Sequence, residues 1–265
     1  MNKVSVAIPT YNPSSYLELL LKNLNKINQI KEIVINDDNS NKSELRKVET
    51  ILSNFANRSN KDIRFFKNIK NLGPYDNKFI AISKCKMDYV YQIDQDNLPN
   101  IMSLKWIFKF NKLMKYKNCL ILPGKNYPFR FDHQKEKRNR KSRIVTFNKN
   151  IQINTKQIIP MLENQNSKIN EMIRHSLALG NPIVCKADYK LNLQEGFGNR
   201  NIIHDTAAIA YYWLKNGGKI QILKNFSLHT RRHNDSYYSN DPRGIVSSKE
   251  ISVQGSKYFD LITKL

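Results

Sequence analysis

The chain has 265 residues, of which 40% are hydrophobic, enough for one large domain or two closely fused ones with a buried core. Lys and Arg number 44 against 22 Asp and Glu, which gives a formal net charge of +22. This excess indicates a negatively charged partner, such as nucleic acid, an anionic lipid surface or a phosphorylated substrate. A Lys- and Asn-rich codon bias would also raise the number of lysines.

Cysteine spacing and hydropathy exclude several classes of protein. Cys85, Cys119 and Cys185 lie far apart without a C-x-x-C pair, which argues against a disulfide framework and a zinc knuckle. The apolar start at 4–8 is too short for a signal peptide, and no apolar run approaches the roughly 18 residues of a membrane span. We therefore expect a cytoplasmic protein, with peripheral attachment to the inner face of the cell membrane as a further candidate.

The first hundred residues alternate between predicted strands and helices. Short β-prone runs predict strands at 4–8, 32–36, 63–66 and 89–93, and apolar residues at helical spacing predict a helix around 17–24. This βαβ order predicts an α/β fold of Rossmann-like type, with a mostly parallel central sheet flanked by helices.

The second half is less regular. Its predicted elements are strands at 119–122, 181–186 and 219–223 and a helix that begins at Asp205 and stops at Gly217. The segment 135–143 is dense in Lys and Arg and lacks a hydrophobic period, so we interpret it as a mobile basic loop. No repeat or low-complexity linker divides the chain, which predicts one domain at 1–225 and a less ordered tail at 226–265.

Four acids follow predicted strands directly: Asp37, Asp38, Asp94 and Asp96. Carboxyl ends of parallel strands share one edge of a sheet, so these carboxylates are expected to gather there. The D-x-D spacing of Asp94 and Asp96 suits a hard divalent cation, Mn²⁺ or Mg²⁺, that bridges phosphate groups. An isolated D-x-D is more often a turn or a helix cap.

Four segments in order and register resemble the family 2 glycosyltransferases of the GT-A fold: VSVAIPTYN at 4–12, IVINDDNS at 33–40, NLG at 71–73 and IDQD at 93–96. The resemblance is strong over about 1–100 and looser over about 175–225. It implies that 1–225 is one catalytic domain, with a nucleotide-binding half at 1–100 and an acceptor-side half at 101–225.

The resemblance assigns the nucleotide-sugar donor to residues that follow the strands: Pro9, Thr10, Tyr11, Asp38, Asn71, Gly73 and Asp94. Tyr11 can stack on the base, and Asp38 can accept a hydrogen bond from a base N–H, although a simple turn is the alternative for Asp38. The family often has a basic residue near the diphosphate where this chain offers Tyr75 or Lys78.

The same resemblance implies a metal ligand at Asp96 and a second at His229, with His233 as the competing histidine. It also implies a general base. His204 and Asp205 match an acidic pair of the family, with His in place of the first acid, and the second acid is the base. A helix N-cap is the alternative role for Asp205, and the role of His204 stays open.

The resemblance implies an inverting, metal-dependent transfer of a sugar from a nucleotide diphosphate, with UDP the expected nucleotide. The expected acceptor is a saccharide or lipid-linked hydroxyl in the synthesis of surface polysaccharide or glycolipid. Two alternatives remain, a basic nucleic-acid-binding protein and a sugar-phosphate nucleotidyltransferase. The chain has no recognisable nucleic-acid module, so no nucleic-acid partner is expected, and its first loop lacks the glycines typical of nucleotidyltransferases.

Overall fold

The computed structural model describes residues 3–109, 112–129, 145–163, 168–231 and 248–265. The predicted basic loop at 135–143 and the candidate ligand His233 lie outside these residues.

Ten strands of the described chain form one sheet in the order β3-β2-β1-β4-β9-β6-β10-β5, with β7 beside β6 and β8 beside β10. The strands are β1 (Val4–Thr10), β2 (Ile30–Asp37), β3 (Asp62–Lys67), β4 (Tyr89–Gln92), β5 (Leu98–Pro99), β6 (Cys119–Phe129), β7 (Val145–Thr146), β8 (Ile151–Ile153), β9 (Ile183–Cys185) and β10 (Lys219–Arg231).

Strand direction separates the two halves of the sheet. Strands β3, β2, β1 and β4 are parallel, as the sequence predicts, and so are β6 and β10. Strand β9 runs antiparallel between β4 and β6, and β5, β7 and β8 are also antiparallel to their partners. The carboxyl ends of β1, β2 and β4 therefore meet at one edge, where Thr10 pairs with Asp37.

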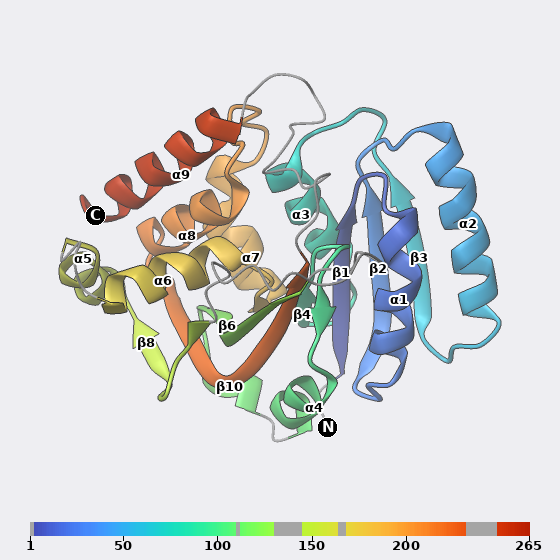
Figure 1. The fold of residues 1–265 in the computed structure, drawn as a ribbon, viewed down its shortest axis with the longest axis horizontal. Helices are drawn as coiled ribbons and strands as arrows, with labels where there is room; N and C mark the ends of the chain where they lie inside the picture. Colours follow the sequence, from blue (N-terminus) through green and yellow to red (C-terminus); the bar gives the residue numbers. More distant parts are fainter. Residues whose placement is uncertain (1–2, 110–111, 130–144, 164–167, 232–247) are drawn as a thin grey trace.

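Helices flank this sheet, as Figure 1 shows. They are α1 (Ser14–Asn25), α2 (Lys42–Ala56), α3 (Pro74–Ser83), α4 (Ile101–Lys109), α5 (Thr155–Glu163), α6 (Lys168–Leu179), α7 (Lys186–Leu193), α8 (Asp205–Lys215) and α9 (Ser248–Ile262), with short 3₁₀ turns at Lys112–Lys115 and Gln194–Gly196.

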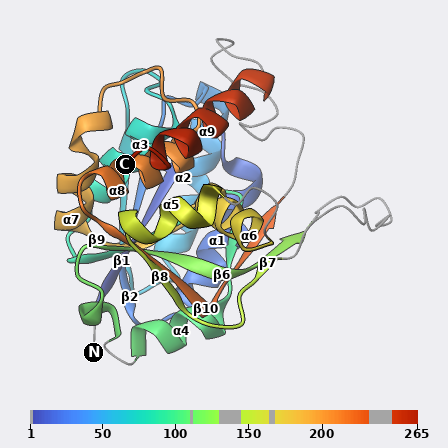
Figure 2. The same cartoon turned by 90° about the vertical axis from the view of Figure 1, so that its left-hand side faces the viewer.

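The core lies on both faces of the sheet. All seven residues of β1 are buried, and successive side chains point to opposite faces. Val6 and Ile8 pack in one apolar cluster with Leu20 of α1, whereas Ala7 packs in the other with Phe79 of α3. In Figure 2 the helices α5, α6, α8 and α9 lie above the sheet and α4 lies below it. This two-sided burial explains why the strands read as continuous apolar runs.

The C-terminal segment differs from the predicted tail at 226–265. Strand β10 continues through Phe226 to Arg231, because its second half keeps pairing with the equally long β6 after an irregularity between Leu223 and Ser227. Helix α9 then packs on α8 and buries Tyr258 and Phe259 in the main core. Strand β10 and helix α9 therefore both pack with the elements of the domain predicted at 1–225 and add to its core.

Among the described helices, none combines the length and the apolar character that a membrane crossing requires.

Candidate active site

The loop after β1 is fastened to the D-x-D segment through Gln95, the residue between the two acids. The backbone N–H of Tyr11 donates to Gln95 Oε1, and Gln95 Nε2 donates to the backbone oxygen of Tyr11, both at 2.8 Å. Two segments 84 residues apart are thus locked together, with Tyr11 left partly exposed beside them. The loop after β1 and the D-x-D segment therefore lie together at the carboxyl edge of the sheet.

Pro9 and Thr10 are the last residues of β1, and both are buried. The backbone oxygen of Thr10 accepts a hydrogen bond from the Asp38 N–H at 2.8 Å, which ties the ends of β1 and β2. Asp37 is also buried and accepts from the N–H and hydroxyl of Ser40. The buried Thr10 and Asp37 therefore support this edge of the sheet from inside the protein.

Asp38 holds the loop that leads into α3. Its Oδ1 accepts from the Leu72 N–H and from Asn68 Nδ2, both at 2.8 Å, and its Oδ2 accepts from the Gly73 N–H at 2.9 Å. Burial raises the pKa of this carboxyl, and the three hydrogen bonds act against that rise. Asn71 also accepts from the Gly73 N–H, and Gly73 has a φ of 92°, which a glycine adopts without strain.

Asp94 lies just after β4 and is held on several sides. Its backbone N–H donates to Asn181 Oδ1 at 2.7 Å, and Asn181 Nδ2 donates back to Asp94 Oδ2 at 3.3 Å. Gln92 Nε2 donates to Asp94 Oδ1 at 2.9 Å. Burial raises the pKa of Asp94, while the ammonium group of Lys78 acts against the rise.

Lys78 of α3 bridges the two carboxylates that the sequence assigns to different tasks. Its Nζ lies 2.9 Å from Asp94 Oδ1 and 2.6 Å from Asp205 Oδ2. The Lys78 and Asp205 side chains are only 6% and 4% exposed. A buried charge needs a partner, and here one ammonium group compensates two carboxylates. The D-x-D segment and the start of α8 therefore form one connected site.

Asp205 is the first residue of α8, and the N-cap is its neighbour. His204 occupies the cap position, and its Nδ1 accepts from the Ala207 N–H at 3.4 Å. The N-cap alternative for Asp205 is therefore wrong: His204 takes that role, which leaves the Asp205 carboxylate directed to Lys78. Burial lowers the pKa of His204, although the Asp205 carboxylate acts in the opposite sense. A neutral imidazole is the form that can accept this bond.

Asp96 is half-buried at the same edge, two residues before β5. No group of three or more His, Cys, Asp or Glu side chains converges to hold a metal ion within the described part of the chain. The Asp94 oxygens are already engaged by Lys78, Gln92 and Asn181. A Mg²⁺ ion would need only one or two of the carboxylates at this edge, since it usually keeps several waters and binds substrate phosphates as well.

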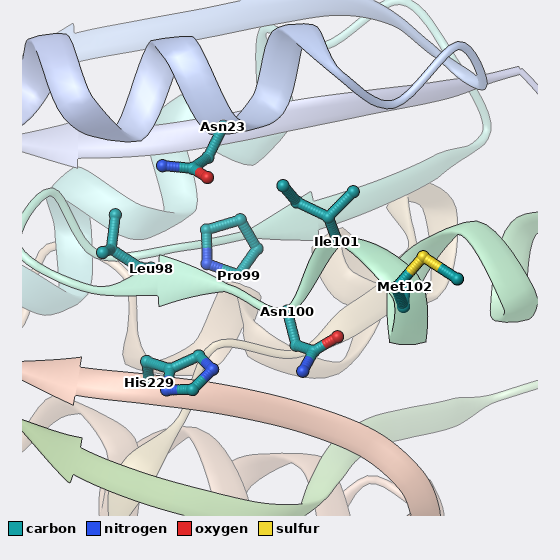
Figure 3. Close-up of a pocket in the computed structure, with 7 residues that line it drawn as sticks. All are labelled: Asn23, Leu98, Pro99, Asn100, Ile101, Met102 and His229. Atoms are coloured by element: carbon teal, nitrogen blue, oxygen red, sulfur yellow. The ribbon is translucent and has the colours of Figure 1, made fainter.

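His229 of β10 pairs with Leu98 of β5 and packs its ring 5.4 Å from that of Tyr127. Figure 3 shows it in a shallow pocket between α1, β5 and the start of α4. This pocket is lined by Asn23, Leu98, Pro99, Asn100, Ile101, Met102 and His229. None of the described residues that line it is a carboxylate, and burial lowers the pKa of His229. Its role as a metal ligand stays a prediction.

Sequence reasoning missed three residues that organise the site. The sequence offers Lys78 only as a candidate phosphate contact, whereas in the structure it connects Asp94 to Asp205. In the sequence, Gln95 is only the residue between the two acids of D-x-D, and Asn181 is only the first residue of a predicted strand. No sequence pattern marks them, because the burial of α3 from Tyr75 to Phe79, polar residues included, is visible only in the structure. Polar side chains buried in a helix need partners, and a lysine needs an anion.

Three features meet at the carboxyl edge of this α/β sheet: the loop after β1, the D-x-D segment and the buried Asp205. The sequence model of glycosyl transferase family 2 matches residues 5–169, more than half of the chain. The chain therefore belongs to glycosyl transferase family 2 and is a glycosyltransferase that uses a nucleotide-sugar donor.

Solved structures of S. aureus TarS share the fold. The complex of TarS 1–349 with UDP-GlcNAc has a TM-score of 0.62 and 19% identity, over 98% of this chain and 66% of that one. The complex with UDP has a TM-score of 0.58 and 17% identity, over 99% and 72%. The chain spans 43% of a longer TarS structure. The expected GT-A fold is confirmed. No curated protein sequence matches this chain.

Proposed function

We propose that the chain transfers a sugar from a UDP-sugar to an acceptor hydroxyl with inversion at the anomeric carbon. The observation that carries the proposal is the bridge of Lys78 between Asp94 and Asp205. It connects the donor-side acid to the candidate base within one ion-pair cluster, so that donor and acceptor can meet there.

In the proposed mechanism Asp205 is the general base. Its carboxylate takes the proton from the acceptor hydroxyl while that oxygen forms a bond to the anomeric carbon. The bond from this carbon to the diphosphate breaks on the opposite face, and the nucleoside diphosphate leaves as an anion. Lys78 keeps the Asp205 oxygen in place and compensates its charge until the proton arrives.

The TarS complexes with UDP and UDP-GlcNAc support a uridine nucleotide as the donor. In this chain Tyr11 is partly exposed for stacking on the base. The Oδ2 of Asp38 accepts one internal hydrogen bond, from Gly73, and a carboxylate oxygen can accept a second. We assign the uracil N–H to that position, with Pro9, Thr10, Asn71 and Gly73 shaping the surrounding loop and Asp94 on the ribose or sugar side.

We assign the divalent ion, Mn²⁺ or Mg²⁺, to Asp96 together with phosphate oxygens of the donor, with His229 as a further candidate ligand. Such an ion stabilises negative charge on a leaving diphosphate.

The acceptor is proposed to be a saccharide or a lipid-linked hydroxyl on a pathway of surface polysaccharide or glycolipid. The net charge of +22 supports work at an anionic membrane surface on the cytoplasmic side.

The test is release of UDP from UDP-GlcNAc by Asp205→Asn and Asp96→Ala. Asp205→Asn keeps the size of the side chain but cannot accept the proton, so kcat should fall about 100-fold or more. Asp96→Ala should lose heat-stabilisation by UDP plus Mn²⁺, since a ligand stabilises only the state that binds it. Glu49→Gln on α2, an exposed acid away from the site, is the control. Full activity in a well-folded Asp205→Asn variant would remove the base assignment.

A further inference from the structure

The C-terminal helix α9 touches the candidate base through the loop that precedes α8. The backbone N–H groups of Ile203 and His204 both donate to Gln254 Oε1 at 2.8 Å. Gln254 Nε2 in turn donates to the backbone oxygen of Asn201. One side chain of α9 therefore holds three backbone groups just before Asp205.

Gly255, the next residue of α9, lies against the His204 imidazole. A Cβ placed on Gly255 would lie 2.2 Å from His204 Cδ2 and 2.6 Å from Nε2, closer than non-bonded atoms allow. The ring cannot swing aside freely, because its Nδ1 caps α8 through the Ala207 N–H. Only glycine at this position accommodates the cap in its present place.

A glycine inside a helix costs about 1 kcal/mol relative to alanine, so its presence needs a packing reason. The apolar side of α9 already attaches it to the domain through the buried Tyr258, Phe259 and Ile262. That contact needs no glycine and no glutamine. The contacts of Gln254 and Gly255 are directed instead at the residues that place Asp205.

We propose that Gln254 and Gly255 are positioning residues of the transferase: they hold the His204 cap, and through it they set the direction of the Asp205 carboxylate. This inference rests on the proposed base role of Asp205. The orientation of the Asp205 carboxylate then depends on helix α9, about 50 residues further along the chain. This helix lies in the segment that the sequence predicts to be a tail.

The first test uses Gly255→Ala and measures UDP release from UDP-GlcNAc in Mn²⁺. Alanine should push the imidazole away, so kcat should fall about tenfold or more while KM for UDP-GlcNAc changes less than about twofold. Val253→Ala, at a 60% exposed position on the same helix, is the matched control and should leave both constants unchanged.

The second test is a rescue. His204→Ser keeps a side chain that can cap the helix but removes the ring that meets Gly255. In this background Gly255→Ala should have no further effect on kcat. An equal loss of kcat in both backgrounds, or no loss in the first, would overturn the inference.

A third measurement needs no substrate. Hydrogen exchange of the Ile203, His204 and Ala207 amides should accelerate in Gly255→Ala and in Gln254→Met, and unchanged exchange in both would overturn the inference. The variant Asp205→Asn distinguishes failure of the base role of Asp205 from failure of the positioning role of Gln254 and Gly255. If it keeps full activity the base role fails, and accelerated exchange would still report the contact of α9; if it is inactive while Gly255→Ala is fully active, only the positioning role fails.

Discussion

The charge balance around Lys78 is the feature on which single substitutions should act most strongly. Two carboxylates and one ammonium group share a largely buried position at the junction of β4, α3 and α8. Removing one member of a buried ion pair leaves an uncompensated charge, which commonly costs 3–5 kcal/mol. An exposed pair contributes at most about 1 kcal/mol, because water screens it.

We therefore expect Lys78→Met to lower the free energy of unfolding by about 3 kcal/mol, measured by urea denaturation at pH 7. The second change Asp94→Asn removes one of the two facing carboxylates, so Lys78→Met/Asp94→Asn should regain part of that loss. Lys86→Met removes an exposed pair with Asp62 and should change stability by less than about 1 kcal/mol. Equal losses in the buried and exposed variants would contradict this account.

At the scale of elements, the His204 cap of α8 should make the stability of the folded protein depend on pH. Burial gives His204 a folded-state pKa below its ordinary 6.5, so the folded protein resists protonation of this ring. The unfolded chain then binds the proton first as the pH falls. Stability is therefore fully present above pH 6.5 and declines as the pH falls towards the folded-state pKa. Protonation would also remove the acceptor that caps Ala207.

His204→Asn keeps a capping side chain and cannot titrate in this range. Between pH 7 and pH 5 the wild type should lose more unfolding free energy than His204→Asn, as followed by thermal or urea unfolding in parallel. A constant difference between the two proteins over this range would show that His204 does not titrate on unfolding.

The ends of β10 and the position of α9 are hard to predict from sequence, because both depend on contacts with other elements. The polar Lys224 and Asn225 interrupt the apolar run and suggest an end at Leu223, but pairing with β6 carries the strand on to Arg231. The buried Tyr258, Phe259 and Ile262 of α9 need a partner surface, and α8 supplies it. A helix that depends on tertiary packing leaves a weak local signal.

At the scale of the whole molecule, the net charge of +22 should attract anionic lipid. We expect co-sedimentation with phosphatidylglycerol-containing vesicles but not with pure phosphatidylcholine vesicles. Raising the salt from about 0.05 M to about 0.5 M should release the protein, because salt screens surface charge. Replacing the basic residues of 135–143 by glutamine should weaken binding. Equal sedimentation with neutral vesicles, or tight binding to oligonucleotides instead, would contradict this role.

The sequence by itself determined the α/β class, the parallel first half of the sheet and the membership suggested by four motifs in register. These follow from short-range patterns, since strand ends carry the turn residues and acids that mark the edge. Which side chains meet across that edge was decided by tertiary structure alone. Lys78 reaches both Asp94 and Asp205, and Gln254 reaches the loop before Asp205, only because α3, α8 and α9 pack where they do. The packing of helices and strands in three dimensions decides which side chain compensates a buried charge. The order of residues along the chain does not identify that side chain.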